Sequence, residues 1–166
     1  RMGNSLPDLI ETVRQAGNRR IAIIGVGNSL NGDDAAGPHV ARLLMEATGQ
    51  RASGGRYLIL DAGPSPEAFS GTLRRFAPDL IIMVDAAELG QAPGTIQWFD
   101  WSAAQGMSAS THTLPPSLLA RFLVEELGCE MLLLGIQPRQ LDLDGGESPE
   151  MIAAVHEVAE GLAALL

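Results

Sequence analysis

Four short runs of almost uninterrupted apolar residues constrain the fold of this chain more than any other feature. They are RIAIIG at 20–25, YLIL at 57–60, DLIIMV at 79–84 and MLLLGI at 131–136. A strand with one side in water alternates apolar and polar residues, so unbroken runs predict strands that are covered on both faces. Segments of helical character separate the runs, which indicates a mostly parallel sheet.

The remaining elements complete an α/β pattern. We expect helices over about 6–16, 34–48, 65–76, 115–127 and 150–166, and a weaker strand with alternating character over 94–101. In the last helix one stripe holds Val155, Val158 and Leu162, which predicts packing on the core and not a dimer face. We therefore predict one α/β domain over residues 1–166. Its mostly parallel, twisted sheet has about five strands, with helices on both faces.

The composition excludes several classes of protein. Of the 166 residues, 46% are hydrophobic and only 19% are charged, which argues against a disordered chain. Lysine and arginine number 11 against 20 acidic residues, and the formal net charge is -9. Phosphate backbones and anionic membranes repel such a surface, so we expect neither nucleic acid nor a membrane as a partner.

The single cysteine, Cys129, allows no intrachain disulfide and indicates a reducing compartment. No apolar run approaches the roughly 18 residues of a membrane span, and residues 1–15 lack the apolar core of a signal peptide. We expect a monomeric, cytoplasmic protein.

Function is expected just beyond the predicted strands, because ligands of doubly wound sheets bind at the carboxyl ends of the strands. The segments there are GVGNSLNGDD at 25–34, DAGP at 61–64 and DAAE at 85–88. Carboxylates gathered at one edge repel each other, so a proton, a metal ion or a basic partner should neutralise them. The alternative is local: Asp33 or Asp34 caps a helix, and the other acids form turns.

The glycine loop does not predict a nucleotide site. Gly25 and Gly27 match the first two glycines of a dinucleotide-binding loop, but Leu30 stands where the third is needed. The pair Asp33 and Asp34 follows, and an acidic pair suits a cation better than a phosphate.

Asp34, Asp85 and His112 are the candidate chemical groups. Two carboxylates and one imidazole suit a divalent transition metal with open coordination positions, and they could equally act as acid–base groups on a water molecule. His39 lies within a predicted helix and is expected on the surface or in packing. His156 has Glu160 one turn on, and this pair is expected on a solvated helix face and not as a ligand couple. Nucleophiles are poorly supported, because Ser65 lacks a nucleophile-elbow motif and Cys129 precedes an apolar strand.

Five segments, in order, resemble the hydrogenase maturation endopeptidases. They are GVGNSLNGDDAAGP at 25–38, DAGPSPE at 61–67, IMVDAAE at 82–88 with Pro93-Gly94, STHTLP at 110–115 and LGIQP at 134–138. The fourth and fifth segments look most like the branch that serves formate-hydrogenlyase-type hydrogenases, the hydrogenase-3 type. The similarity runs from about residue 20 to the last helix.

The resemblance implies a function and a site. Members remove a short C-terminal extension from the large-subunit precursor of a [NiFe] hydrogenase after nickel has been inserted. It implies that the metal-contacting positions are Asp34, Asp85 and His112, with nickel recognised while the substrate holds it. Asp33 and Asp61 match acidic positions to which we assign no role there.

The chain is thus expected to be an endopeptidase, an aspartic-type or metal-recognising hydrolase in which Asp34 and Asp85 are catalytic. We also expect Gly27, Asn28 and Asp61 to contact the substrate. Either an aspartate activates the attacking water or the metal polarises the scissile carbonyl. The alternatives are another metal-assisted hydrolase of aminopeptidase type, or a non-catalytic nickel-binding or nucleotide-binding module.

Overall fold

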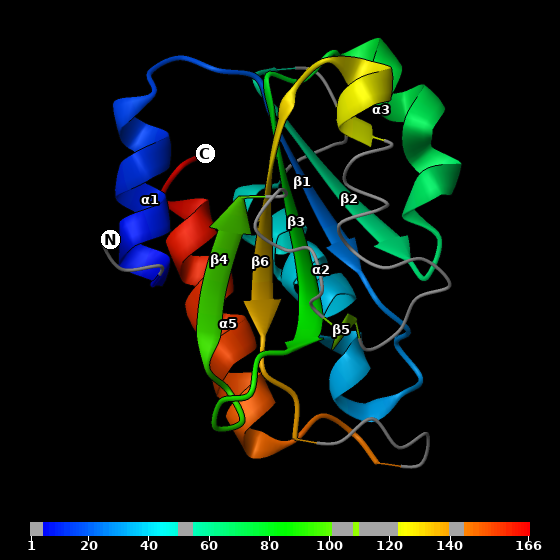
Figure 1. The fold of residues 1–166 in the computed structure, drawn as a ribbon, viewed down its shortest axis with the longest axis vertical. Coiled ribbons are helices and arrows are strands. Elements are labelled where there is room, and N and C mark those ends of the chain that lie inside the picture. The colour runs from blue at the N-terminus through cyan, green and yellow to red at the C-terminus, as the bar shows by residue number, and fades with distance from the viewer. Residues whose placement is uncertain (1–4, 50–54, 101–107, 110–122, 140–144) are drawn as a thin grey trace.

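Five strands form the central sheet of this computed structural model, which describes residues 5–49, 55–100, 108–109, 123–139 and 145–166. The strands are β1 (Ile21–Val26), β2 (Tyr57–Gly63), β3 (Leu80–Glu88), β4 (Ile96–Asp100) and β6 (Glu130–Ile136). They lie side by side in the order β2, β1, β3, β6, β4 (Figure 1). β1 pairs in parallel with β2 and β3, and β3 pairs in parallel with β6, while β4 joins β6 antiparallel. The short strand β5 (Ser108–Ala109) pairs antiparallel with the end of β3.

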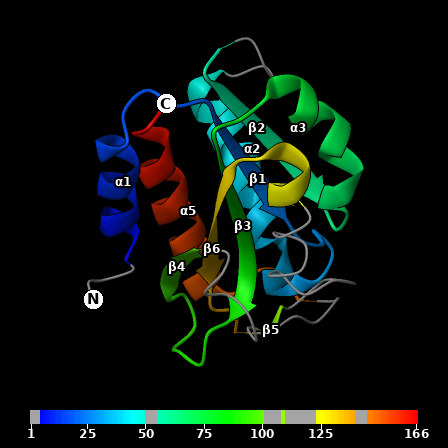
Figure 2. The same ribbon diagram turned by 45° about the horizontal axis from the view of Figure 1, so that its top comes forward.

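Helices cover both faces of the sheet. On one face lie α1 (Leu6–Gln15), α2 (Ala36–Thr48) and α5 (Pro149–Ala163), whose apolar residues share one cluster with the sheet. On the other face lie α3 (Ser70–Phe76) and a helical segment at 123–127, which share a second cluster with the same strands. Figure 2 shows α1 and α5 side by side near β4, with α3 beside the opposite edge. None of the helices in the described part of the chain has the length and apolarity that crossing a membrane requires.

These elements confirm the predicted fold class. All four apolar runs are strands, and three of them, in β1, β2 and β3, keep their apolar residues almost entirely buried. The alternating segment at 94–101 contains β4, a half-buried edge strand. In α5 the stripe Val155, Val158 and Leu162 is fully buried, as predicted. The first half of the helix predicted over 115–127 lies outside the described residues.

Two predicted helices begin later than expected, because a tight turn comes first. Residues Gly32–Ala35 form the 3₁₀ turn η1, and α2 starts after it at Ala36. Likewise the 3₁₀ turn η2 (Pro66–Phe69) precedes α3. The two adjacent aspartates of η1 are therefore held in a turn and not in the first turn of an α-helix.

Close packing of α2 against the sheet positions η1. A Cβ atom on Gly37 would lie 2.2 Å from the carbonyl oxygen of Val26 and 2.4 Å from that of Val84. Only glycine lets the helix backbone approach β1 and β3 this closely. The approach places the turn that precedes α2 at the carboxyl ends of these two strands.

Candidate functional site

The predicted site residues that the structure describes lie at the edge of the sheet where the parallel strands end. Asp61 lies near the end of β2, and Asp85 lies near the end of β3 opposite Gly135 of β6. β1 ends at Val26 between those two strands and continues into the loop that carries Gly27 and Asn28. The arrows of β1, β2, β3 and β6 in Figure 1 point to this common edge.

The loop after β1 contacts Asp34 through both its carboxylate and its backbone. Asn28 donates its backbone N–H to Oδ2 of Asp34 at 3.0 Å, and its own Oδ1 accepts the N–H of Leu30 at 2.9 Å. Gly27 has φ +147°, and a Cβ atom there would lie 2.1 Å from the carbonyl oxygen of Asp34. The Asp34 side chain is almost fully buried. The fold thus holds this carboxylate against the loop that resembles the family signature.

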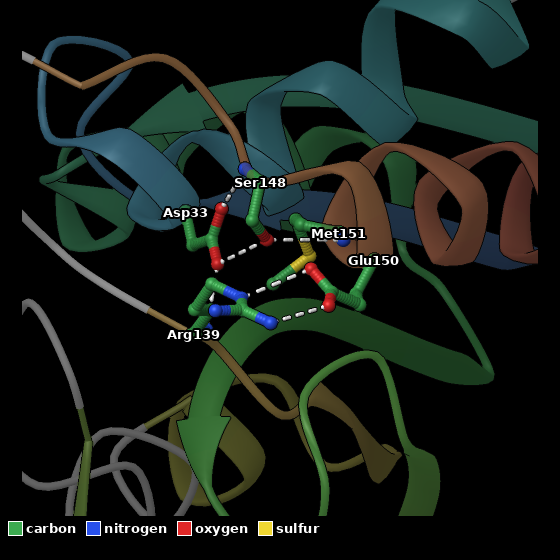
Figure 3. A network of polar contacts seen from close by, with 5 residues as sticks. All are labelled: Asp33, Arg139, Ser148, Glu150 and Met151. Atoms are coloured by element: carbon green, nitrogen blue, oxygen red, sulfur yellow. Dashed lines mark hydrogen bonds and ion pairs between the residues drawn. The ribbon is translucent and has the colours of Figure 1, made fainter.

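Asp33 faces a different part of the chain. Its Oδ1 accepts the backbone N–H of Ser148 at 2.6 Å. Its Oδ2 accepts the backbone N–H of Arg139 at 2.6 Å and the hydroxyl of Ser148 at 2.8 Å. Figure 3 shows this carboxylate between the start of α5 and the segment that follows β6. The helix-capping alternative is wrong for both acids, because neither η1 nor α2 has a side-chain cap.

Around Asp33 the network extends to a charged pair. Arg139 forms two contacts with the Glu150 carboxylate, from Nε at 3.1 Å and from a terminal nitrogen at 2.6 Å. The hydrogen bond from Arg139 lowers the pKa of Glu150. Ser148 also caps α5, since its hydroxyl accepts the N–H of Met151 at 3.2 Å.

Asp61 and Asp85 lie on opposite faces of the sheet. Asp61 points toward α2, where its Oδ2 lies 3.5 Å from Arg42 and its Oδ1 accepts the N–H of Gly63 at 3.3 Å. The predicted turn role of Asp61 is confirmed by that second bond. Asp85 alternates with Val84 and Ala86, which face α2 and its neighbours, so Asp85 faces the other side.

A small pocket opens beside Asp85, and its described lining is otherwise apolar. The lining consists of Met83, Ala87, Phe99, Leu133, Leu134 and Gly135. Asp85 is largely buried, at 9% exposure. A carboxylate at the edge of an apolar pocket can hold a proton or a cation close to a bound peptide.

The donor set fits a divalent metal only in part within the described residues. Asp34 in η1 and Asp85 near the end of β3 are two buried carboxylates, which suit such an ion. His112, the expected third ligand, lies outside the described residues. Within the ranges that the structure describes, no group of three or more His, Cys, Asp or Glu side chains is arranged to hold a metal ion.

Three further residues considered in the sequence have surroundings that indicate structural roles: His39, His156 and Cys129. His39 lies 2.7 Å from the Glu147 carboxylate and stacks edge-on against His156, with ring centroids 5.7 Å apart. Cys129 is buried, and the loss of solvent raises the pKa of its thiol. His39 is half-buried, in agreement with the surface or packing role predicted for it, and His156 is exposed, in agreement with the predicted solvated helix face. The burial of Cys129 agrees with an inert thiol.

Sequence patterns did not reveal the role of Gln137. Its buried side chain accepts the backbone N–H groups of Leu89 at 2.7 Å and Gln91 at 3.3 Å, and it donates to Glu88 at 3.2 Å. The segment after β3 is thereby tied to the end of β6. The only hint in the sequence is that a polar residue directly follows a buried strand. Its hydrogen-bond partners lie more than 45 positions away in the sequence, so the sequence pattern does not identify them.

Comparisons with known proteins agree on one family. The family model described as hydrogenase maturation protease (HycI) matches residues 38–164, a range that contains Asp61, Asp85 and His112. The hydrogenase 3 maturation protease of Escherichia coli K12 is 37% identical over 117 residues, which cover 70% of this chain and 71% of that protein.

Solved structures of this family share the fold. The [NiFe] hydrogenase maturation protease HycI from Thermococcus kodakarensis superposes with a TM-score of 0.83 at 33% identity, covering 96% of this chain and 98% of that one. The endopeptidase HycI from Escherichia coli gives a TM-score of 0.74 at 30% identity, covering 87% and 89%. The coverage is high enough for whole domains to be compared.

Proposed function

The chain belongs to the hydrogenase maturation protease family, and from that premise we propose that it is a processing endopeptidase. Its substrate is the large-subunit precursor of a [NiFe] hydrogenase, from which it removes a C-terminal extension after nickel insertion. One observation carries the proposal: this member of the family buries two carboxylates at one edge of its sheet, Asp85 near the end of β3 and Asp34 in η1, the turn between β1 and α2. We propose that the enzyme is a monomer and that it is cytoplasmic, a location with which its single, buried cysteine agrees.

Nickel enters this proposal as part of the substrate. Asp34, Asp85 and His112 would supply two oxygens and one nitrogen, a set that leaves coordination positions for the ligands with which the precursor already holds its metal. Gly27, Asn28 and Asp61, at the same edge of the sheet, would contact the peptide. The buried setting of Asp34 and Asp85 supports a role for them at the metal, because a carboxylate out of water interacts strongly with a nearby cation.

A shared metal would make processing conditional. A precursor without nickel lacks the contact that joins it to Asp34 and Asp85, and it binds more weakly. If that contact contributes about 3 kcal/mol, loaded and empty precursors differ in affinity by more than about a hundredfold. The enzyme would then cleave only completed subunits.

Water is the proposed attacking group, because the described residues offer no activated serine or thiol. Cys129 is buried and its pKa is raised by desolvation. Two routes agree with the geometry. Asp34 or Asp85 takes a proton from the water, as in aspartic-type hydrolysis, or the substrate's metal polarises the scissile carbonyl.

The decisive experiment incubates the protein with nickel-loaded and nickel-free precursor and measures the precursor mass. We expect a loss of C-terminal mass with loaded precursor only. An unchanged mass with loaded precursor would refute the proposal. Cleavage of short peptides by zinc-loaded protein would favour the aminopeptidase-like alternative, and tight nickel binding without cleavage would favour a carrier.

Two variants separate the chemical roles. Asp34→Asn and Asp85→Asn each keep the size of the side chain and remove its charge. A variant that binds loaded precursor normally but cleaves it at least 100-fold more slowly has lost an acid–base group. A variant that loses binding and cleavage together has lost a metal contact. Glu157→Gln, an exposed change on α5 outside the proposed set and outside the family-like segments, is the control and should alter neither quantity.

A further inference from the structure

Two adjacent carboxylates in η1 are buried, but only one has a role in the proposed function. Asp33 is fully buried and Asp34 is 1% exposed. Burying a second negative charge directly beside the first is costly unless it is compensated by hydrogen bonds. Asp33 has such compensation in the three hydrogen bonds from Arg139 and Ser148.

The partners of Asp33 belong to a distant part of the chain. Ser148 is the N-cap of α5, and Arg139 follows β6 by three residues. The Asp33 carboxylate accepts the N–H of the cap residue itself, so it lies at the positive end of a 15-residue helix. Figure 3 shows the carboxylate joining the two segments. These bonds join η1 to the start of α5 and to the segment that follows β6.

The bonds to Asp33 act on Asp34 through the backbone. Asp34 donates its N–H to the carbonyl oxygen of Asn31 at 2.9 Å, and its own carbonyl oxygen fills the space at Gly27. The Asp34 carboxylate accepts the N–H of Asn28 at 3.0 Å. If η1 rotated, the peptide between Asp33 and Asp34 would turn and this last bond would break.

We infer that Asp33 is a positioning residue, which holds η1 against the start of α5 so that the Asp34 carboxylate keeps its orientation in the site. The catalytic consequence of this inference rests on the proposed function, but its structural consequence does not. It gives a role to the acidic position that the resemblance left without one.

The first test measures orientation without any substrate. Asp33→Asn places an amide NH₂ group against one of two backbone N–H donors whichever way the amide turns, so at least one bond is lost. We expect hydrogen exchange at the Asn28 amide to become at least tenfold faster, while exchange in the paired core of β1 and β3 stays the same. Glu150→Gln, which breaks the neighbouring ion pair and spares Asp33, should leave Asn28 unchanged within twofold.

A second variant keeps the test decisive if Asp33→Asn does not fold. Ser148→Ala removes one bond to Asp33 together with the cap of α5. Ser5→Ala removes the corresponding cap of α1 and leaves the bonds from Arg139 and Ser148 to Asp33 in place. Faster exchange at Asn28 is expected in the first and not in the second. Unchanged exchange at Asn28 in every folded Asp33 or Ser148 variant overturns the inference.

The catalytic consequence is tested by a double-mutant comparison under conditions where each protein is folded. Asp33→Asn should lower kcat/KM for loaded precursor at least tenfold. In the Asp34→Asn background, Asp33→Asn should lower kcat/KM by less than twofold, because the positioned group is already lost. Where cleavage in that background is not measurable, precursor affinity is compared instead, and it too should fall by less than twofold. A further tenfold loss there would indicate an independent role and overturn the inference. Failure of the unmodified protein to cleave loaded precursor would refute the proposed function, while the exchange result would still decide the role of Asp33.

Discussion

Asp33 and Asp34 show how strongly the role of a side chain depends on what surrounds it. Both are aspartates in one short turn, and both are buried. One carboxylate bonds to Ser148 at the start of α5, and the other bonds to Asn28 in the loop after β1. A carboxylate that accepts two backbone N–H groups and a hydroxyl is suited to holding structure, and a carboxylate beside the loop after β1 is suited to meeting a ligand.

Cys129 provides a direct prediction about reactivity. Burial raises the pKa of its thiol, so the reactive thiolate is scarcer at neutral pH than for an exposed cysteine. We expect a thiol reagent at pH 7.5 to label the folded protein at least about 100-fold more slowly than the protein in denaturant. Because the sequence has one cysteine, absorbance of the released reagent reports this residue alone. Equal labelling rates in the two states would contradict the burial of Cys129.

Glu150 provides a prediction about pH. Its pKa is lowered by the hydrogen bond from Arg139, so the pair stabilises the fold at pH values above the ordinary glutamate range. That contribution is lost as the pH falls through the lowered pKa. We expect Glu150→Gln to reduce the free energy of unfolding slightly at pH 7 and not at pH 2.5, as measured by urea denaturation. The difference at pH 7 should shrink in 1 M salt, because both side chains are partly exposed.

At the scale of elements, the contact between α2 and the strands beneath it depends on a missing side chain. Gly37→Ala would put a Cβ atom 2.2 Å from the carbonyl oxygen of Val26, and backbone atoms cannot yield as a side chain can. We expect a loss of about 3 kcal/mol in the free energy of unfolding, although alanine is the better helix former.

The control for this prediction is Gly71→Ala in α3. A Cβ atom there would meet only the Arg75 side chain, at 3.6 Å. The same substitution should therefore be neutral or stabilise the protein by up to about 1 kcal/mol. Similar effects of the two substitutions in urea denaturation would show that α2 can move away from the sheet.

The elements that could be predicted are those whose signal is local. Unbroken apolar runs indicated β1, β2, β3 and β6, because burial on both faces leaves its mark within each run. The antiparallel direction of β4 and the turn before α2 have no such mark. The partners of Asp33 and Gln137 were also hidden, since a hydrogen bond to a residue 106 or 48 positions away depends on the fold that brings the two together.

The candidate site was predictable in position more than in detail. Strand ends in a parallel sheet meet at one edge, so Asp34, Asp61 and Asp85 were expected there. The structure places Asp61 and Asp85 near the ends of β2 and β3, and Asp34 in the turn before α2. Which face each side chain occupies depends on strand register. Asp61 faces Arg42 on α2, whereas Asp85 faces the opposite side of the sheet.

The whole molecule is a single sheet between two apolar layers. Leu44 of α2 belongs to the cluster on one face, and Leu73 of α3 belongs to the cluster on the other. Both clusters draw buried residues from β1, β2, β3 and β6, with neighbouring residues such as Ile81 and Ile82 pointing to opposite faces. If either layer unfolded, one face of these strands would be exposed to water, and the sheet on which the other layer packs would lose stability.

We therefore expect the described elements to unfold as one cooperative unit. Leu44→Ala and Leu73→Ala each remove a fully buried side chain and should each cost about 2–5 kcal/mol. Urea unfolding can be followed by tryptophan fluorescence, to which Trp98 contributes from the α2 face, and by labelling of Cys129, which lies on the α3 face. Within each variant, fluorescence and Cys129 labelling should give the same urea midpoint, and the two probes should show the same shift from the unmodified protein. A Leu73→Ala protein in which Cys129 becomes accessible at a lower urea concentration than the fluorescence midpoint would show that the two layers are separable.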